Sequence, residues 1–230
     1  MKVLHITESV YSCGVPVVIK ECIEAANLRG LSEPKIVGPH NPTSVLKVDI
    51  EFPSLCFSKK RNYYVTALTF STFKMLKKIL RENDIVHCHS VSFLSLLLAI
   101  VKRLSKSRAK LVFHFHTDHV KYLKYWHGWW SRFEIPIANW AVKQCIKAAD
   151  RVIFPSEFTR LRYQKILRFK SSKTVVWACP IKLPELKETP RFRKKTFNGE
   201  YQAIYVGRVG REKGIEPMLD FHHLLVSLGF

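Results

Sequence analysis

Short apolar segments alternate with longer segments of helical periodicity along most of this chain, and this alternation restricts the folds open to it. The apolar segments have the length and the β-branched content of buried strands. They are Lys2–Ile6, Lys35–Val37, Glu51–Leu55, Ile85–Cys88, Lys110–His114, Val152–Phe154 and Thr174–Trp177. Helical spacing predicts helices at Val17–Leu28, Tyr64–Leu80 and Phe93–Leu104, and one or two over Val120–Ala149. The pattern predicts an α/β fold, a mostly parallel sheet with helices on both faces.

The region around residues 180–199 breaks the alternation. It carries three prolines and the cation-rich stretch Arg191–Lys195, which are features of an interdomain linker. Beyond it, an apolar run at 203–206 and a helical pattern from Ile215 to Leu228 predict one strand and one helix. We therefore predict an N-terminal domain at 1–180, a linker at 181–200 and, at 201–230, the first strand–helix unit of a second, incomplete domain.

The turn Gly207–Gly214, between that strand and that helix, has the features of an anion site. A turn that opens a helix presents backbone N–H groups and the positive end of the helix dipole. Arg208 can hold a phosphate through a bidentate fork, and Lys213 adds a compact charge. An ordinary turn with solvated cations has the same residues, so both interpretations stay open on the residues alone.

The formal net charge of +20 predicts an anionic partner. Lysine and arginine are enriched in two stretches that contain no acid, 57–81 and 158–184. Such a surface attracts polyanions, either nucleic acid or anionic lipid. Charge alone does not choose between these two partners.

The cysteines and the apolar segments bear on location. Six cysteines are scattered without a Cys-x-x-Cys pair, which favours a reducing cytosol over a disulfide framework. Met1 and Lys2 lead directly into the first strand, so we expect no signal peptide. The longest apolar stretch, Val91–Val101, is too short to cross a bilayer. These features predict a cytoplasmic protein, soluble or peripheral to a membrane.

Glycine and histidine residues supply further candidate ligands. After the first predicted strand stands a single glycine, Gly14, in place of the three-glycine fingerprint of dinucleotide-binding folds, which argues against a NAD enzyme. His87 and His89 end one predicted strand, and three histidines follow in residues 114–119. Alternation places His114 and His116 on one face, within reach of a shared ion. The usual spacing of zinc ligands is absent, so we predict no metal site.

Aromatic side chains recur at helical spacing between residues 122 and 133. The residues that share this spacing are Tyr122, Tyr125, Trp126, Trp129, Trp130 and Phe133. Two interpretations fit: a stripe buried in the core, or a surface helix whose aromatic face enters the lipid headgroups. In the second, Lys121, Lys124 and Arg132 hold anionic lipid. Gly128, in the middle of the segment, favours a kink.

Several short motifs, in order along the chain, resemble those of retaining glycosyltransferases of family 4, and in particular the glycolipid-forming branch. These enzymes have the GT-B fold, which consists of two Rossmann-like domains. The motifs are Asp84–His89, Phe115–Thr117 with Tyr122, Ala149–Ile153 with Ser156 and Glu157, and Gly207-Arg208 with Glu212–Gly214. Family members usually have paired glycines at the position of Gly14, where this chain has Cys13 beside a single glycine.

The resemblance implies a reaction and a set of donor-binding residues. A sugar would move from a UDP- or GDP-linked donor to a hydroxyl acceptor with retention of configuration, without a cofactor or a bound metal. Gly14, Arg208 and Lys213 would bind the nucleotide-sugar. His116 would be the catalytic residue in the cleft, where it would hydrogen-bond a sugar hydroxyl or assist proton transfer.

The resemblance also implies an acceptor side. Thr117, Tyr122 and Tyr125 would face the acceptor. The basic surface and the aromatic residues favour a membrane lipid and an anionic membrane surface on the inner side of the cell membrane. A saccharide acceptor stays open as an alternative.

Two other functions stay open. A basic nucleic-acid-binding protein also places cations on phosphates and aromatic rings on bases. No recognised binding motif is present, and the cations are dispersed over several predicted elements, so we expect no nucleic-acid partner. The paired-glutamate motif of family 4 would lie beyond residue 230, so these 230 residues alone could also be a non-catalytic half of such an enzyme.

Overall fold

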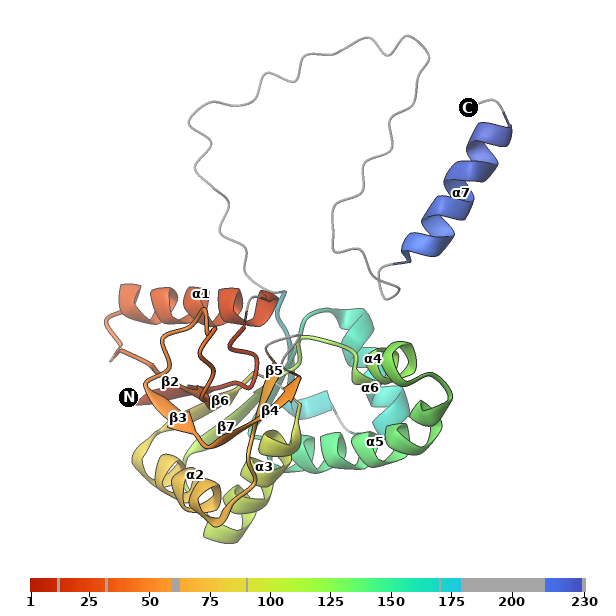
Figure 1. The fold of residues 1–230 in the computed structure, drawn as a ribbon. Helices are drawn as coiled ribbons and strands as arrows, with labels where there is room; N and C mark the ends of the chain where they lie inside the picture. Colours follow the sequence, from red (N-terminus) through yellow and green to blue (C-terminus); the bar gives the residue numbers. More distant parts are fainter. Residues whose placement is uncertain are drawn as a thin grey trace, which may run out of the picture.

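The computed structural model describes residues 1–11, 13–31, 33–58, 63–89, 91–169, 171–178 and 214–228. Its main feature is a seven-stranded parallel sheet with the strand order β3-β2-β1-β6-β7-β8-β9 (Figure 1). The strands are β1 (Val3–Ile6), β2 (Lys35–Pro39), β3 (Ile50–Phe52), β6 (Ile85–Cys88), β7 (Lys110–His114), β8 (Arg151–Phe154) and β9 (Thr174–Val176). The predicted α/β fold with a mostly parallel sheet is confirmed.

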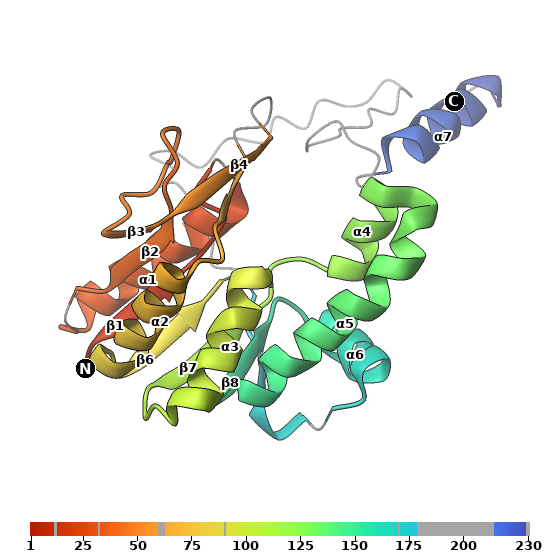
Figure 2. The same cartoon turned by 60° about the horizontal axis from the view of Figure 1, so that its bottom comes forward.

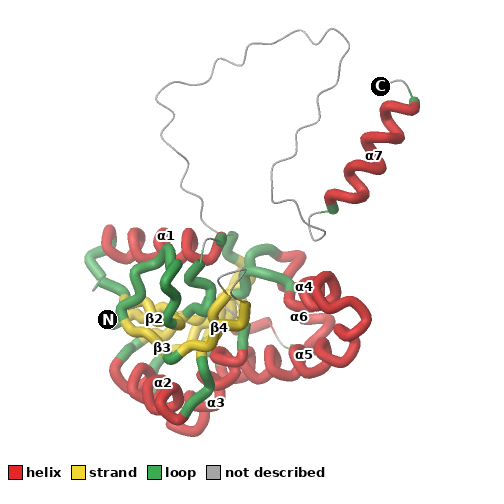
Figure 3. The backbone as a smooth tube through the Cα atoms, in the orientation of Figure 1, coloured by secondary structure: helices red, strands yellow, loops and turns green. Residues whose placement is uncertain are grey.

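Helices cover both faces of this sheet (Figures 1 and 3). One face carries α1 (Gly14–Leu28). The other face carries α2 (Phe70–Glu82), α3 (Phe93–Ser105), α5 (Ser131–Ala148) and α6 (Glu157–Leu167). The main hydrophobic core lies on this second face, where Leu4, Ile6, Val86 and Cys88 pack with apolar residues of α2, α3 and α5. Because successive side chains of a strand alternate between faces, His5 and His87 point to the opposite face, that of α1.

The region between β3 and α2 differs from the prediction. A hairpin of β4 (Ser54–Ser58) and β5 (Tyr63–Thr66) pairs antiparallel there. The predicted strand 51–55 is two strands separated at Pro53, which has no N–H to continue a ladder. The predicted helix start at Tyr64 is wrong, because α2 begins at Phe70 after Thr69. The Thr69 side chain accepts a hydrogen bond from the Thr72 N–H and caps the helix.

The aromatic segment also differs from a single helix. Gly128 adopts a φ of +54°, a backbone conformation that residues other than glycine rarely adopt. It separates α4 (His119–His127) from a short 3-10 helix, η2 (Gly128–Trp130), and from α5. The predicted kink is confirmed, and of the one or two helices predicted for Val120–Ala149 the structure has two, whereas the continuous aromatic stripe on one helix is not found.

The C-terminal region is described only from residue 214 to 228. Helix α7 (Ile215–Ser227) confirms the helix predicted there, and its apolar side chains, including Phe221 and Leu224, are exposed. The predicted linker, the predicted strand at 203–206 and the candidate anion turn with Arg208 and Lys213 lie outside the described residues. Among the described helices, none is long and apolar enough to cross a bilayer.

Candidate functional site

The carboxyl ends of the parallel strands meet at one edge of the sheet, and most predicted site residues lie there. The segment after β1 leads into the N-terminus of α1, His89 follows β6, and His116 and Thr117 follow β7. In open α/β sheets, ligands bind outside this edge, at the point where the strand order reverses. Here the order reverses between β1 and β6, which place His5 and His87 in register.

Helix α1 presents an open N-terminus at this edge. Gly14 is its first residue, and Cys13 at the N-cap position makes no side-chain capping hydrogen bond. The first turn holds no acidic residue, so the positive end of the helix dipole is not neutralised there by a carboxylate. A Cβ built on Gly14 meets no heavy atom within 4 Å. The backbone at Gly14 can therefore approach an anionic ligand closely.

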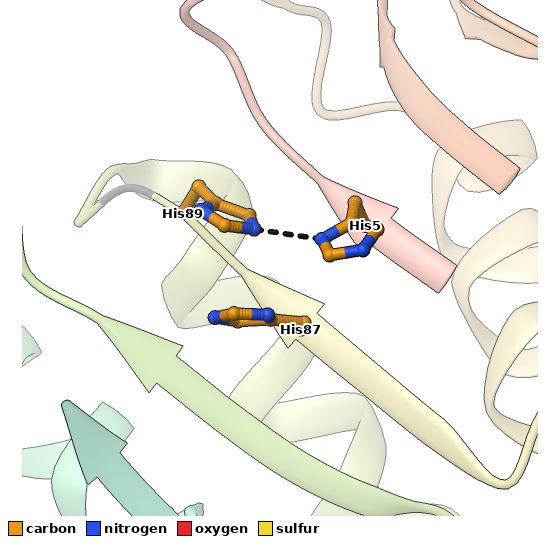
Figure 4. A group of neighbouring side chains, drawn as sticks. All are labelled: His5, His87 and His89. Atoms are coloured by element: carbon orange, nitrogen blue, oxygen red, sulfur yellow. Dashed lines mark hydrogen bonds between the residues drawn. The ribbon is translucent and has the colours of Figure 1, made fainter. Parts of the chain in front are cut away.

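Five histidines gather beside that edge and form what we call the histidine cluster: His5, His87, His89, His114 and His116 (Figure 4 shows the first three). Two direct contacts link them into a chain. His5 Nδ1 lies 2.8 Å from His89 Nε2, and His89 Nδ1 lies 3.2 Å from His116 Nε2. The other rings stack or tilt against these, with centroids 4.0 Å apart for His87 and His89 and 4.1 Å apart for His114 and His116. His116 is the half-buried member, and the other four are buried.

Burial keeps the histidine cluster uncharged. It lowers the pKa of His5 and of His116 to about 4. Burial, and then the neighbouring histidines, lower the pKa of His114 to about 3. The same two causes hold the pKa values of His87 and His89 well below 6.5. All five imidazoles are therefore neutral at pH 7, with one nitrogen of each able to accept a hydrogen bond or bind an ion.

The segment after β7 is fixed by a network beneath it. The Asp118 carboxylate accepts hydrogen bonds from the N–H groups at the start of α4 and lies 2.8 Å from Arg162 Nε. The Tyr163 hydroxyl lies 2.7 Å from His119 Nδ1 and 3.3 Å from the Thr117 carbonyl oxygen. His119 therefore anchors the loop and is not a member of the histidine cluster. These bonds hold the backbone on which His116 and Thr117 stand.

The predicted acceptor residues lie on the surface of this segment. Thr117 is exposed in the loop, and Tyr122 is 40% exposed on α4. The side chain of Tyr125 lies outside what the structure describes. His116 and Thr117 thus lie at the edge that also holds Gly14, and Tyr122 follows them on α4. A shallow groove along α1, lined by Lys20, Ile23, Glu24, Asn27 and Leu28, contains none of the predicted site residues.

An exposed aromatic face continues from this segment onto α5. The face consists of Trp129, Trp130, Phe133, Ile137 and Trp140, each more than half exposed. Trp129 and Trp130 stack with ring centroids 4.1 Å apart, and the Arg132 guanidinium lies 5.0 Å from the Trp129 ring and 4.8 Å from the Phe133 ring. Helix α4 and the first turns of α5 stand away from the sheet (Figure 2). Of the two interpretations of the aromatic stripe, the buried one is therefore wrong for Trp129, Trp130 and Phe133, and the surface one agrees with their exposure.

Three members of these groups were missed by reasoning from sequence. His5 lies between Leu4 and Ile6, so it reads as part of an apolar strand, and only the register with β6 places it against His87. Ile137 and Trp140 continue the aromatic face along α5, four and seven residues after Phe133. That helical spacing was a usable signal beyond residue 133.

Comparison with known proteins places the chain in a family. The profile of Glycosyltransferase Family 4 matches residues 14–184. A UDP-GlcNAc 2-epimerase from Neisseria meningitidis bound to UDP-GlcNAc is 13% identical, with a TM-score of 0.47 over 76% of this chain and 45% of that one. An alpha-glucosyltransferase in complex with UDP-glucose and DNA containing an abasic site is 12% identical, with a TM-score of 0.45 over 78% and 42%. The chain thus spans less than half of each of these structures, and no curated protein sequence matches it significantly.

Proposed function

The chain belongs to glycosyltransferase family 4, and we propose that it transfers a sugar from a nucleotide diphosphate donor to a hydroxyl group of a membrane lipid, with retention of configuration. The observation that carries the proposal is the position of His116. It is a half-buried, neutral imidazole at the same sheet edge as the open N-terminus of α1. A donor diphosphate at the helix N-terminus would bring its sugar to that edge.

The donor side combines a helix terminus with cations. The backbone at Gly14 and the dipole of α1 stabilise negative charge on the diphosphate, and this charge grows as the sugar leaves. Arg208 and Lys213, from the segment that resembles the start of the second domain, add full positive charges in the intact protein. UDP- and GDP-linked sugars both fit this arrangement.

His116 acts by hydrogen bonding. Its pKa of about 4 lies far below neutral pH, so the imidazole is a weak acceptor of a full proton. A neutral ring still donates one hydrogen bond and accepts another, which suits the orientation of a sugar hydroxyl. Of the two roles that the sequence leaves open, hydrogen bonding fits the burial of His116 better than proton transfer.

Replacing Arg208 with alanine tests the donor side. We expect a 10–100-fold loss in kcat/KM for the donor, because a hydrogen bond to a charged group contributes about 1.5–3 kcal/mol. The assay uses the longest form of the protein present in its source cells, whose intact mass is measured first. Arg211→Ala, in the same turn, is the matched control and should change kcat/KM less than threefold. Undiminished activity in Arg208→Ala would remove the assignment of Arg208 to the diphosphate.

The lipid acceptor is supported by the aromatic face and its cations. Exposed indole rings with arginine above them are typical of surfaces that enter lipid headgroups, where apolar side chains insert and cations contact phosphates. Lys121 and Lys124 are exposed on α4, the helix that precedes this face, and would each add roughly 1 kcal/mol at an anionic surface. The protein would then act at the inner face of the cell membrane as a peripheral enzyme.

Liposome flotation tests the aromatic face directly. The double variant Trp130→Ser and Phe133→Ser should bind anionic vesicles at least tenfold more weakly, because each ring that leaves the lipid forfeits on the order of 1–2 kcal/mol of apolar burial. Phe158→Ser and Leu161→Ser, which remove exposed apolar residues of α6, are the matched control. Equal loss in both pairs, or binding that is indifferent to lipid charge, would favour a saccharide acceptor.

A further inference from the structure

Three rings of the histidine cluster lie close together inside the protein. His5 in β1 and His87 in β6 are directly in register, and His89 follows two residues later on the same face (Figure 4). Each ring offers one nitrogen, and the three nitrogens all lie within 4.8 Å of one another. The exposed fractions of His5, His87 and His89 are 3%, 9% and 0%. Three nitrogen donors thus surround one small volume that is shielded from bulk water.

The hydrogen bonding of these rings is incomplete. His87 Nε2 is buried and has no hydrogen-bond partner among the described residues. An unpaired buried nitrogen of this kind destabilises the folded state, because it has lost its hydrogen bonds to water and gained none in the protein. His5 Nδ1 and His89 Nε2 are 2.8 Å apart and share a single proton between them. A ligand that accepts three nitrogen lone pairs would satisfy all three rings at once.

We propose that His5, His87 and His89 bind one divalent transition-metal ion, of which Zn²⁺ is the representative. Imidazole nitrogens suit Zn²⁺, Co²⁺, Ni²⁺ and Cu²⁺, whereas Mg²⁺ and Ca²⁺ require oxygen ligands. A tetrahedral ion with bonds of about 2.0–2.1 Å needs nitrogens about 3.4 Å apart, so the three rings would reorient when the ion binds. Burial already keeps the imidazoles neutral, as metal binding demands.

Three protein ligands leave a fourth position of the ion open. The ligands are uncharged, so the ion keeps its positive charge and favours a small anion such as hydroxide there. The site differs in this respect from a structural zinc site, which the protein closes with four ligands. It also lies at the sheet edge where α1 presents its N-terminus.

The ion would be linked to His116 through one hydrogen bond. When His89 binds the metal through Nε2, its other nitrogen carries the proton, and His89 Nδ1 lies 3.2 Å from His116 Nε2. His89 then donates and His116 accepts, which leaves the N–H of His116 on Nδ1. This link rests on the proposed function of His116, whereas the metal site itself does not.

Cobalt titration of the chelator-treated protein tests the site without any substrate. Tetrahedral Co²⁺ has a visible absorption spectrum that octahedral Co²⁺ in water lacks, and isothermal titration calorimetry with Zn²⁺ gives the stoichiometry. We expect one ion per chain, and at least 100-fold weaker binding in His87→Gln and in His89→Gln. His114→Gln is the matched control, because His114 is buried and stacks on His87 with a centroid distance of 5.5 Å, yet is not a ligand in this proposal. It should change affinity less than threefold.

The thermal transition provides a second measurement that separates misfolding from loss of a ligand. Zn²⁺ should raise the Tm of the parent protein and of His114→Gln, and should leave the Tm of folded His87→Gln unchanged.

The proposal is overturned by any one of three results. The first is that the folded parent protein gives no stoichiometric Co²⁺ spectrum. The second is that binding survives in both His87→Gln and His89→Gln. The third is that binding is lost in His114→Gln. The last result would assign the ion to His89, His114 and His116, the other group of three ring nitrogens within 4.8 Å. Normal metal binding with no glycosyl transfer would reject the proposed function and leave the metal site standing.

Discussion

Acidification from pH 6.5 to pH 4.5 is expected to remove most of the stability of this fold. Four buried histidines, His5, His87, His89 and His114, have pKa values lowered by burial, to about 4 for His5 and about 3 for His114. In the unfolded chain each titrates near 6.5. Between these values the unfolded state binds protons that the folded state does not, so the free energy of unfolding falls as the pH falls.

The size of this effect follows from the number of histidines. Each contributes a slope of about 1.4 kcal/mol per pH unit in that window, so four together give roughly 5 kcal/mol per unit. Native domains are commonly stable by only about 5–15 kcal/mol. Above about pH 7.5 the four imidazoles are almost entirely neutral in both states, and their contribution is fully present.

Urea unfolding followed by circular dichroism, at pH values from 7.5 to 4.5 and with EDTA present, measures the slope. His114→Leu should retain stability at pH 7.5 and lose about one histidine's share of the slope. His40→Gln is the control, because His40 is exposed and pairs with Glu51 on the surface. A free energy of unfolding that stays constant down to pH 5 would contradict the burial of the histidine cluster in solution.

The sheet was predictable because its central strands are buried on both faces. Ile85–Cys88 and Lys110–His114 are short, apolar and bounded by polar residues, and both match the structure without a shift at either end. The hairpin of β4 and β5 was missed because Tyr63–Thr66 runs directly into residues of helical spacing. The capping hydrogen bond of Thr69 fixes the start of α2, and no periodicity in the apolar residues reveals it.

The candidate site was predictable only in part, because spacing along the chain carries no information about register or exposure. His87, His89, His114 and His116 stand out in the sequence, but His5 joins them only through the pairing of β1 with β6. For the aromatic residues, the spacing along the chain predicts that they share one face of a helix but not whether that face is buried. The arrangement of α4 and α5 around Gly128 decides that the face is exposed.

Replacing His116 with alanine is expected to reduce kcat about 100-fold, with less than a threefold change in KM for the donor. The imidazole is placed to hydrogen-bond the sugar as charge develops on it, and a positioned hydrogen bond that matters mainly in the transition state lowers kcat when it is removed. The measurement is steady-state transfer by the longest form of the protein. His127→Ala is the control, since His127 is exposed on α4 and pairs with Glu134.

The variant His116→Asn distinguishes the two roles of this histidine. An amide can donate and accept hydrogen bonds but cannot take up a proton at neutral pH. If His116 acts by hydrogen bonding, the kcat of His116→Asn should therefore be at least tenfold higher than the kcat of His116→Ala. Equal loss in the two variants would assign proton transfer to His116 instead. That result would also require the pKa of His116 to rise well above about 4 when substrate is bound, and a pH profile of kcat would detect the rise. Full activity in His116→Ala would remove His116 from the reaction altogether and leave the histidine cluster as a binding or structural element.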